Sequence, residues 1–323
     1  MSIGRLLVSM VLPLSFASTA TLAVDKPFSF VAIGDMPYAM PADGVKFERL
    51  IERINEAKPA FTIHVGDIKG GASPCTDDSF RYVRNVFDRV EGALVYTPGD
   101  NEWTDCHRGK AGCWNPLERL RKIREMFVEK GTSLGRKPLS VLQQAPEAGP
   151  NGLPENATWK HGGVRFGTLH VVGSNNNLGR EAAADAEYEA RSVANAAWLK
   201  RIFADARAES AAGLVLAIHA NPLFERESMK RTGFNRFIDG LTSEALTFRK
   251  PVLLIHGDTH KLQFGQPLFR DARKKQRIDH FFRLEVMGAS EVHGVIVTVD
   301  PASPGLFAVA PLLVGENRRS AKP

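Results

Sequence analysis

The sequence is poor in cysteine, has few long apolar runs and carries no large excess of charge of one sign. Its 323 residues include three cysteines and a formal net charge of +6. After the first residues no segment is long and apolar enough to span a membrane. No run of Lys and Arg is dense enough to indicate a nucleic-acid-binding patch. These absences argue against a membrane-embedded protein and against a nucleic-acid-binding one.

Several catalytic signatures are also missing. The sequence contains no Gly-rich phosphate loop, no nucleophile elbow around a serine and no heptad pattern,. The composition is 43% hydrophobic and 24% charged, which is ordinary for a globular protein that buries a sizeable core. The small excess of positive over negative side chains favours anionic substrates.

The first residues have the pattern of a secretory signal. Arg5 supplies the positive charge, the apolar run LLVSMVLPLSFAS follows, and STATLA offers small residues for cleavage near Ala20 or Ala23,. We therefore expect residues 1–23 to be a signal peptide and residues 24–323 to be the mature protein. The expected location is periplasmic or secreted, with no membrane span left after cleavage.

Three cysteines allow one internal disulfide and leave one free thiol. Cys75 and Cys106 each follow a loop at a strand end, and we favour this pair because closing the longer loop removes more unfolded-state entropy,. The local pair Cys106–Cys113 is the alternative, and the sequence does not fix the choice.

Strand and helix patterns alternate along most of the chain. Residues 131–163 are rich in Gly and Pro, and we expect an irregular surface insertion there,. The last three strand patterns follow one another without helices, which predicts an antiparallel sheet. Together these features predict one α/β domain, built as a four-layer αββα sandwich of two mixed β-sheets flanked by helices.

Four predicted strands end on the same dipeptide, Gly-Asp. A single Gly-Asp is usually a turn, but four in one chain, with two histidines in similar positions, are hard to explain as turns. Ligands gather at the carboxyl ends of strands in α/β sheets, and glycine allows a close approach of the backbone. The residues concerned are Asp35, Asp67, Asp100, Asp258, His219 and His260.

Converging carboxylates need cations. Two like charges about 4 Å apart at an effective dielectric near 20 repel by roughly 4 kcal/mol. Metal ions would remove that cost, and mixed Asp, Asn and His ligation suits Mn, Fe or Zn. The sequence therefore predicts a metal site.

In chain order the motifs are GDMPY, HVGD, GDNEW, AIHAN and GDTH, between Gly34 and His260. With them the chain resembles the calcineurin-like metallophosphoesterases, which include the purple acid phosphatases. Their pattern is D-x-H, G-D, G-N-H-D/E, a lone His after a strand, and G-H-x-H. The resemblance implies hydrolysis of small phosphate mono- or diesters by a metal-bound hydroxide, with two divalent or trivalent ions (Mn, Fe or Zn).

By position, the resemblance implies a first metal held by Asp35, Asp67 and His260. Asp67 would bridge to a second metal, held also by Asp100, His219 and Asp258.

The sequence departs from the family pattern at several places. Pro37 replaces one imidazole, and we expect the neighbouring Tyr38 to be a packing residue. Asn101 replaces the histidine that assists the leaving group. Asn101 and Glu102 are the candidate catalytic residues by position, and the proton for the leaving group must come from water or Glu102. Asp258 replaces a histidine, for which His256 is an alternative ligand. These departures keep a second hypothesis open, namely a protein of this fold that binds a metal or a partner without turnover.

Overall fold

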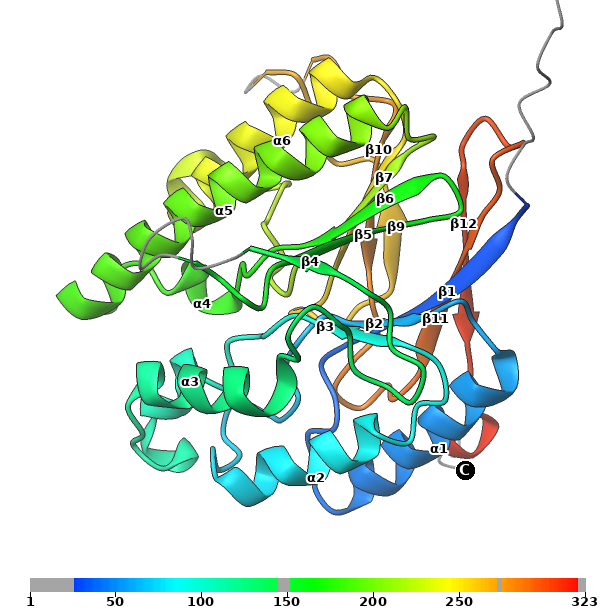
Figure 1. Cartoon of the computed structure of the whole chain (residues 1–323). Helices are drawn as coiled ribbons and strands as arrows, with labels where there is room; N and C mark the ends of the chain where they lie inside the picture. The colour runs from blue at the N-terminus through cyan, green and yellow to red at the C-terminus, as the bar shows by residue number, and fades with distance from the viewer. Residues whose placement is uncertain (1–25, 145–151, 272–274, 319–323) are drawn as a thin grey trace, which may run out of the picture.

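The computed structural model describes residues 26–144, 152–271 and 275–318. The expected signal peptide at residues 1–23 lies outside the described residues, as does part of the expected insertion. The described chain forms four layers, in which two sheets face each other and helices cover their outer faces (Figure 1). The predicted αββα architecture is confirmed.

The first sheet has five strands in the order β12-β11-β1-β2-β3. Strands β1, β2 and β3 run parallel, and β11 and β12 extend the sheet in antiparallel fashion beyond β1. The strands are β1 (Phe28–Ile33), β2 (Thr62–His64), β3 (Leu94–Tyr96), β11 (Gly294–Val299) and β12 (Phe307–Leu312).

The second sheet has seven strands in the order β4-β5-β6-β7-β8-β10-β9. Strands β6, β7, β8 and β10 are parallel, while the outer strands pair antiparallel. The strands are β4 (Leu142–Gln143), β5 (Ala157–His161), β6 (Val164–Thr168), β7 (Leu214–Ala217), β8 (Val252–His256), β9 (Gln263–Gly265) and β10 (Phe281–Glu285).

The helices lie on the two outer faces. Helices α1 (Ala42–Ala57), α2 (Asp77–Phe87) and α3 (Pro116–Phe127) cover the five-stranded sheet, and α5 (Ala182–Ala208) and α6 (Asn235–Phe248) cover the other (Figure 1). Local sequence sets the helix starts. The Thr76 side chain accepts a hydrogen bond from the Ser79 backbone N–H at the start of α2, and Asn115 caps α3 ahead of Pro116,.

Three hydrophobic clusters separate the four layers. One lies between α1–α3 and the first sheet and includes Phe47 and Phe87. A second lies between α5, α6 and the second sheet and includes Phe203. The third fills the space between the two sheets, where Phe30 and Phe166 meet edge-on at 5.5 Å between ring centroids. Burial of apolar side chains in all three clusters holds the sheets face to face.

Two sequence-based expectations about the sheets are wrong. The insertion at residues 131–163 is not wholly irregular, because β4 and β5 within it form the edge of the seven-stranded sheet. The last three long strands do not make one antiparallel sheet either, since β10 pairs parallel to β8 while β11 joins β1 in the other sheet. Strand pairing is decided by long-range partners that a local pattern does not reveal.

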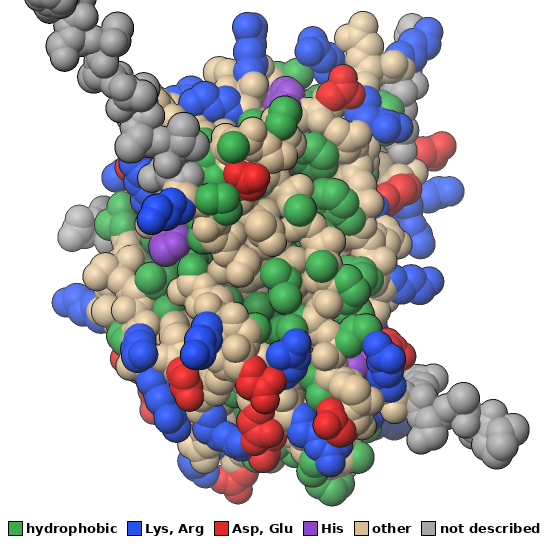
Figure 2. All heavy atoms as spheres, turned by 90° about the vertical axis from the view of Figure 1, so that its right-hand side faces the viewer, with side chains coloured by type: hydrophobic (Ala, Val, Ile, Leu, Met, Phe, Trp, Pro, Cys, Tyr) green, Lys and Arg blue, Asp and Glu red, His purple; other side chains and the backbone are tan. Residues whose placement is uncertain are grey.

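Figure 2 shows the side of the molecule on which β12 lies in Figure 1. On this face Lys and Arg side chains stand among Asp and Glu toward the upper and lower parts, with uncharged surface between them. Pro311 in β12 cannot donate to a further strand, which protects this edge from pairing with other chains,. Among the described residues, no helix has the length and apolarity that crossing a bilayer would require.

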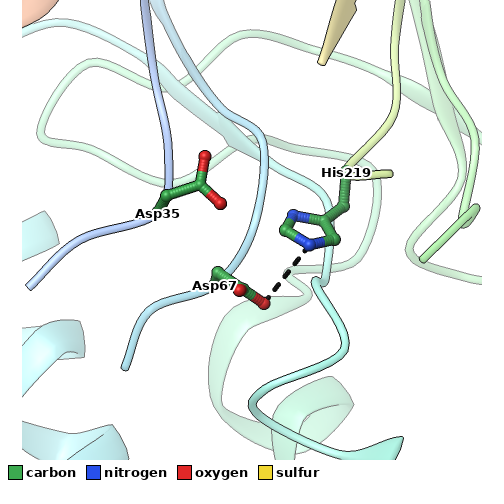
Figure 3. Close-up of side chains that lie close together, drawn as sticks. All are labelled: Asp35, Asp67 and His219. Atoms are coloured by element: carbon green, nitrogen blue, oxygen red, sulfur yellow. Dashed lines mark ion pairs between the residues drawn. The ribbon is translucent and has the colours of Figure 1, made fainter. Parts of the chain in front are cut away.

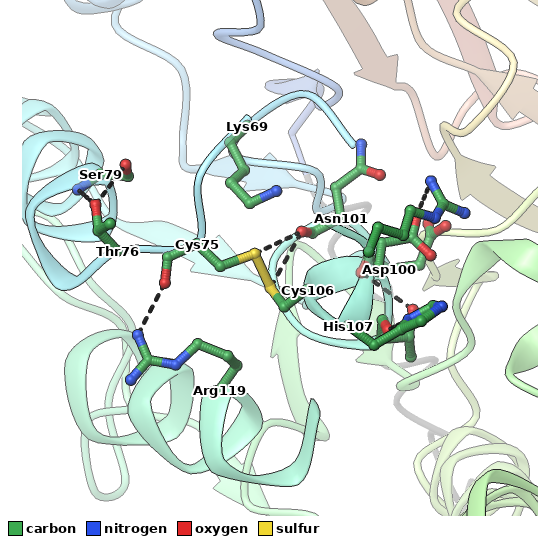
Figure 4. Close-up of a disulfide and its surroundings, with 12 residues drawn as sticks. Lys69, Cys75, Thr76, Ser79, Asp100, Asn101, Cys106, His107 and Arg119 are labelled. Atoms are coloured by element: carbon green, nitrogen blue, oxygen red, sulfur yellow. Dashed lines mark hydrogen bonds and ion pairs between the residues drawn. A yellow bond between two sulfur atoms is a disulfide. The ribbon is translucent and has the colours of Figure 1, made fainter. Parts of the chain in front are cut away.

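A disulfide joins Cys75 and Cys106, as favoured from the sequence, and Cys113 is free and exposed. The bond connects the loop that follows β2 to the loop that follows β3 (Figure 4). Both sulfur atoms lie 3.6 Å from the backbone oxygen of Asn101. Arg119 of α3 donates to the Cys75 carbonyl at 2.9 Å, so the helix layer supports the same loop.

Removing this bond will lower stability. The two cysteines are 31 residues apart, and closing a loop of that length is worth about 3–4 kcal/mol in the chain-entropy model. We expect a Cys75→Ser/Cys106→Ser variant to lose a large part of that amount in denaturant unfolding, whereas Cys113→Ser changes stability little. Thiol titration of the native parent protein should find one reactive thiol per chain; three would contradict the pairing.

Candidate metal centre

The strand-end residues come from both sheets and meet at the seam between them. Asp35, Asp67 and Asp100 follow β1, β2 and β3 of the first sheet, while His219 and Asp258 follow β7 and β8 of the second. Parallel strands place their carboxyl ends at one edge of a sheet, and face-to-face packing brings the two edges together. The side chains of Asp35, Asp67 and His219 point toward one another in Figure 3.

The aspartates themselves make the turns. Asp35 and Asp67 have φ of 56°, and Asp258 has φ of 79°. This left-handed region is costly for most residues, though Asp tolerates it better than others. Strained backbone of this kind clusters at functional sites because the surrounding structure must hold it.

The glycines before the aspartates make room for a neighbouring carboxylate. A Cβ atom on Gly99 would lie 2.2 Å from an oxygen of Asp67, and one on Gly257 would lie 2.1 Å from an oxygen of Asp35. Only Gly66 among these glycines has positive φ, at 90°. The repeated Gly-Asp therefore reflects close approach more than turning, because a Cβ atom on Gly34, Gly99 or Gly257 would meet a neighbouring side chain, and one on Gly66 would meet the backbone of Gly99.

Two overlapping groups of side chains can hold a metal ion. One consists of Asp35, Asp67 and His219, the other of Asp100, His219 and Asp258, and within each group the ligand atoms lie within 4.8 Å of one another. His219 belongs to both, whereas the resemblance implied Asp67 as the shared residue. Asp67 and Asp100 still lie close together, because the Nε2 atom of His219 is 3.4 Å from Asp67 Oδ1 and 2.9 Å from Asp100 Oδ1.

Unsatisfied buried atoms indicate that this space suits a cation. Asp35 Oδ2, Asp100 Oδ1 and His219 Nε2 are buried without a hydrogen-bond partner. The Nδ1 atom of His219 lies 2.9 Å from the carbonyl oxygen of Val65. Since a carbonyl can only accept, Nδ1 carries a proton, and the atom that faces the carboxylates is Nε2, whose lone pair becomes available to a cation once Nε2 releases its proton. Carboxylate oxygens without hydrogen bonds, beside one imidazole nitrogen, are the kind of ligand that hard and borderline ions such as Mn, Fe or Zn prefer.

The pKa shifts of the site residues show that clustering these carboxylates is costly when no ion is bound. Burial raises the pKa of Asp35 to about 8 and that of Asp258 to about 6. Burial also raises the pKa of Asp67 well above its ordinary value. Burial opposes a charge on His219, yet the carboxylates of Asp67 and Asp100 outweigh it and raise the pKa of this imidazole well above the usual range. A bound cation would replace these retained protons.

Tyr38 belongs to the site, contrary to the expectation of a packing residue. Its hydroxyl donates to Asp67 Oδ2 at 2.7 Å, accepts from Asn101 Nδ2 at 3.2 Å and lies 3.3 Å from His260 Nε2. Burial and the charge of Asp67 raise the pKa of this phenol well above its ordinary value. The sequence does indicate this placement of Tyr38. Tyr38 lies shortly after Asp35, and one tight turn between them can bring both side chains to the same end of β1.

The other predicted residues lie around this centre. The Asn101 side chain and backbone N–H both donate to Asp67, so Asn101 fixes that carboxylate. His260 joins neither group, and its Nε2 atom is 3.7 Å from Asp35 Oδ1. His256 is fully buried outside both groups, with its Nδ1 atom 2.9 Å from the carbonyl oxygen of Gly257.

Glu102 faces the backbone. Its Oε1 atom accepts from the N–H groups of Gly99 and Asp67 and from the Tyr96 hydroxyl, and the residue is fully buried. This geometry favours a role in shaping the loops after β2 and β3 over proton transfer to a leaving group.

A turn of left-handed residues after β6 also contacts the site. Residues 174–177, Ser-Asn-Asn-Asn, all have φ between 52° and 66°, and the segment is labelled α4 (Gly173–Asn176). The buried Arg191 donates to Asn176 Oδ1 at 2.6 Å and holds the turn. Ser174 donates to Asp100 Oδ2 at 3.0 Å. Side chains that tolerate left-handed backbone are the sequence signal that marks this segment.

No protein-family model and no curated protein sequence matches the chain. Among solved structures it is similar to a purple acid phosphatase from yellow lupin (Lupinus luteus) seeds, with a TM-score of 0.51 and 11% identity over 93% of this chain. The chain has the metallophosphoesterase fold. It spans 57% of the length of that phosphatase, and at such low identity the likeness concerns the fold alone.

Two further structures are more distant. A dimetal phosphatase from Danio rerio matches with a TM-score of 0.48 and 12% identity, over 88% of this chain and 98% of its own. The protein TT1561 of Thermus thermophilus matches with a TM-score of 0.46 and 10% identity, over 88% and 99%. At this level of likeness the chemistry of the site rests on its own residues.

The pKa shifts predict how the metal-free protein responds to pH. Asp35 and His219 hold protons in the folded state at pH values where the unfolded chain has released them. The folded state therefore binds more protons between about pH 6.5 and 8, and stability falls as pH rises through this window,. Thermal unfolding in chelator should show the decline, and excess Mn²⁺ should reduce it. A melting temperature that rises with pH in chelator would contradict this assignment.

Metal stoichiometry will test the sharing of His219. Because His219 belongs to both groups, His219→Ala should lower metal content more than either Asp35→Asn or Asp258→Asn, each of which disrupts one group. Asp205→Asn on the exposed side of α5 is the matched control. Metal analysis of folded variants, checked by circular dichroism, decides the matter. Equal metal content in all four variants would rule out both groups as ligands.

Proposed function

We propose that the chain is an exported, metal-dependent phosphoesterase that hydrolyses small phosphate mono- or diesters. The observation that carries this proposal is the set of buried Asp35, Asp100 and His219 atoms that make no hydrogen bond and face one another at the seam of a metallophosphoesterase fold. When bound, the ions supply Lewis acidity that activates water and offsets the charge of the phosphoryl group. Two divalent or trivalent ions, Mn, Fe or Zn, suit the donors.

Residues of this chain would prepare the site for that chemistry. Val65 orients the His219 ring, while Tyr38 and Asn101 hold Asp67 through three hydrogen bonds. Such fixed orientation reduces the reorganisation that a reaction requires. The disulfide between Cys75 and Cys106 holds the backbone around Asn101.

The proposed location, periplasmic or secreted, is supported by that disulfide. Disulfides persist in oxidising compartments and are rare in the cytosol of most organisms. The signal-like pattern at residues 1–23 supports the same location,.

A protein that binds metal without turnover is the competing proposal. Asn101 occupies the position of the family's leaving-group histidine, and Glu102 is engaged by backbone N–H groups. Both observations leave water as the proton source for a leaving group. Esters with acidic leaving groups need no such donor, so they are the substrates most favourable to this site.

Hydrolysis assays separate the two proposals. Protein stripped with chelator and reloaded with Mn, Fe, Zn, Mg or Ca would be assayed with aryl phosphate mono- and diesters. We expect turnover that requires metal and falls at least about a hundredfold in His219→Ala, which removes a shared ligand. Asp205→Asn should keep parent activity. Stoichiometric metal binding without turnover in every combination would favour the competing proposal.

A further inference from the structure

A second polar pocket adjoins the candidate metal centre. It has a volume of about 280 Å³ and lies between the segment that follows β3 and the left-handed turn at residues 174–177. Ser174 forms part of its wall and also donates to Asp100 Oδ2 at 3.0 Å. The pocket therefore begins one hydrogen bond away from a candidate metal ligand.

Arg108 lines this pocket and lies near Asn101 of the candidate metal centre. Its Nη1 atom pairs with Asp105 Oδ2 at 2.6 Å, and its Nη2 atom donates to Ser174 Oγ over a long 3.4 Å. A Cβ atom built on Gly71 would lie 2.7 Å from Asn101 Oδ1 and 3.1 Å from Arg108 Nη1. The guanidinium is thus close to the residue that replaces the family's leaving-group histidine, and one of its nitrogens is weakly engaged.

Arg180 lines the far side of the same pocket. Its Nε atom is buried and has no hydrogen-bond partner. Its Nη2 atom reaches Asn177 Oδ1 only at 3.4 Å, and its Nη1 atom pairs with Glu181, whose side chain is 57% exposed. An exposed ion pair contributes little, and a buried donor without a partner is costly. Arg180 therefore has hydrogen-bonding capacity that an oxyanion would satisfy.

The charge balance of the pocket favours an anion. Asp105 is almost fully buried and offsets Arg108. Arg180 is offset only by Glu181, whose exposed carboxylate lies outside the lining residues and forms a weak ion pair that a bound anion can replace,. The guanidinium fork matches the planar carboxylate and the phosphate oxygens better than a point charge does.

We propose that this pocket, between Arg108 and Arg180, binds a second anionic group carried by the leaving portion of the substrate. The substrate class is then a phosphoester that bears a carboxylate or a further phosphate a few bonds from the ester oxygen. This inference rests on the proposed function for the orientation of the ester, with its phosphoryl group at the metal centre and its leaving group toward Arg108. The binding of the anion itself requires no turnover.

Two phosphate esters of nearly equal size provide the test. Glycerol 3-phosphate and 3-phosphoglycerate share the phosphoester, and only the second carries a carboxylate. Their affinities for the metal-loaded protein would be measured by calorimetric titration, with metal content checked in each variant. The variants are Arg108→Ala, Arg180→Ala and Arg180→Lys, and Arg201→Ala on the exposed side of α5 is the matched loss of one positive charge.

We expect the parent protein to bind 3-phosphoglycerate about tenfold more tightly, as one charge-assisted interaction would give. Arg180→Ala should abolish that difference and leave the affinity for glycerol 3-phosphate within about twofold, while Arg180→Lys should restore part of it. Arg108→Ala should weaken both ligands, because Arg108 also borders the metal centre. Arg201→Ala should behave as the parent.

Equal affinity of the parent for both esters would overturn the proposal. So would a preference for 3-phosphoglycerate that survives in Arg180→Ala, since the carboxylate would then bind elsewhere, for instance at the metal. These outcomes are independent of the hydrolysis assays. If the protein shows the arginine-dependent preference but no turnover, the anion-binding pocket stands and the proposed function fails. If the protein is active but shows no preference, the proposed function stands and the anion-binding pocket fails.

Discussion

The structure depends on the convergence of several buried carboxylates at one place. Asp35, Asp67, Asp100 and Asp258 leave their strands toward the same space, and their mutual repulsion would oppose folding unless protons or cations offset it,. Much of the surrounding sequence serves this arrangement. Glycines leave room for neighbouring carboxylates, and aspartates adopt left-handed backbone. Donors from Tyr38 and Asn101 satisfy Asp67, and Ser174 satisfies one oxygen of Asp100.

The two-sheet architecture explains how one imidazole serves both groups of ligands. His219 follows β7 of the second sheet, yet its ring is oriented by Val65 of the first. The hydrophobic cluster between the sheets, with Phe30 and Phe166 in contact, fixes the distance across the seam. Core packing and site geometry are therefore coupled, and a cavity in this cluster would move the ligands as well as lower stability.

Local patterns predicted the elements well but their partners less well. The capping residues Thr76 and Asn115 and the apolar periodicity of α1 indicate helices directly. The short β4 and β5 escaped detection because two to five residues in a Gly- and Pro-rich stretch carry too little periodicity,. The sheet assignment of β10 failed for another reason, since pairing depends on β8, which lies about thirty residues earlier in the chain.

By itself the sequence determined the fold class and the set of acidic and histidine residues at strand ends, and it favoured Cys75–Cys106 without fixing that pair, which the structure shows. These features follow from the local spacing of apolar residues and from the repeated Gly-Asp and His residues at strand ends, a combination that few other folds would produce. Only the tertiary structure decided that His219 joins both groups, that Glu102 turns to the backbone and that Tyr38 enters the site. The pocket between Arg108 and Arg180 likewise exists only after folding. The direction of a side chain depends on contacts between residues that are far apart in the chain. The spacing of residues along the sequence does not reveal those contacts.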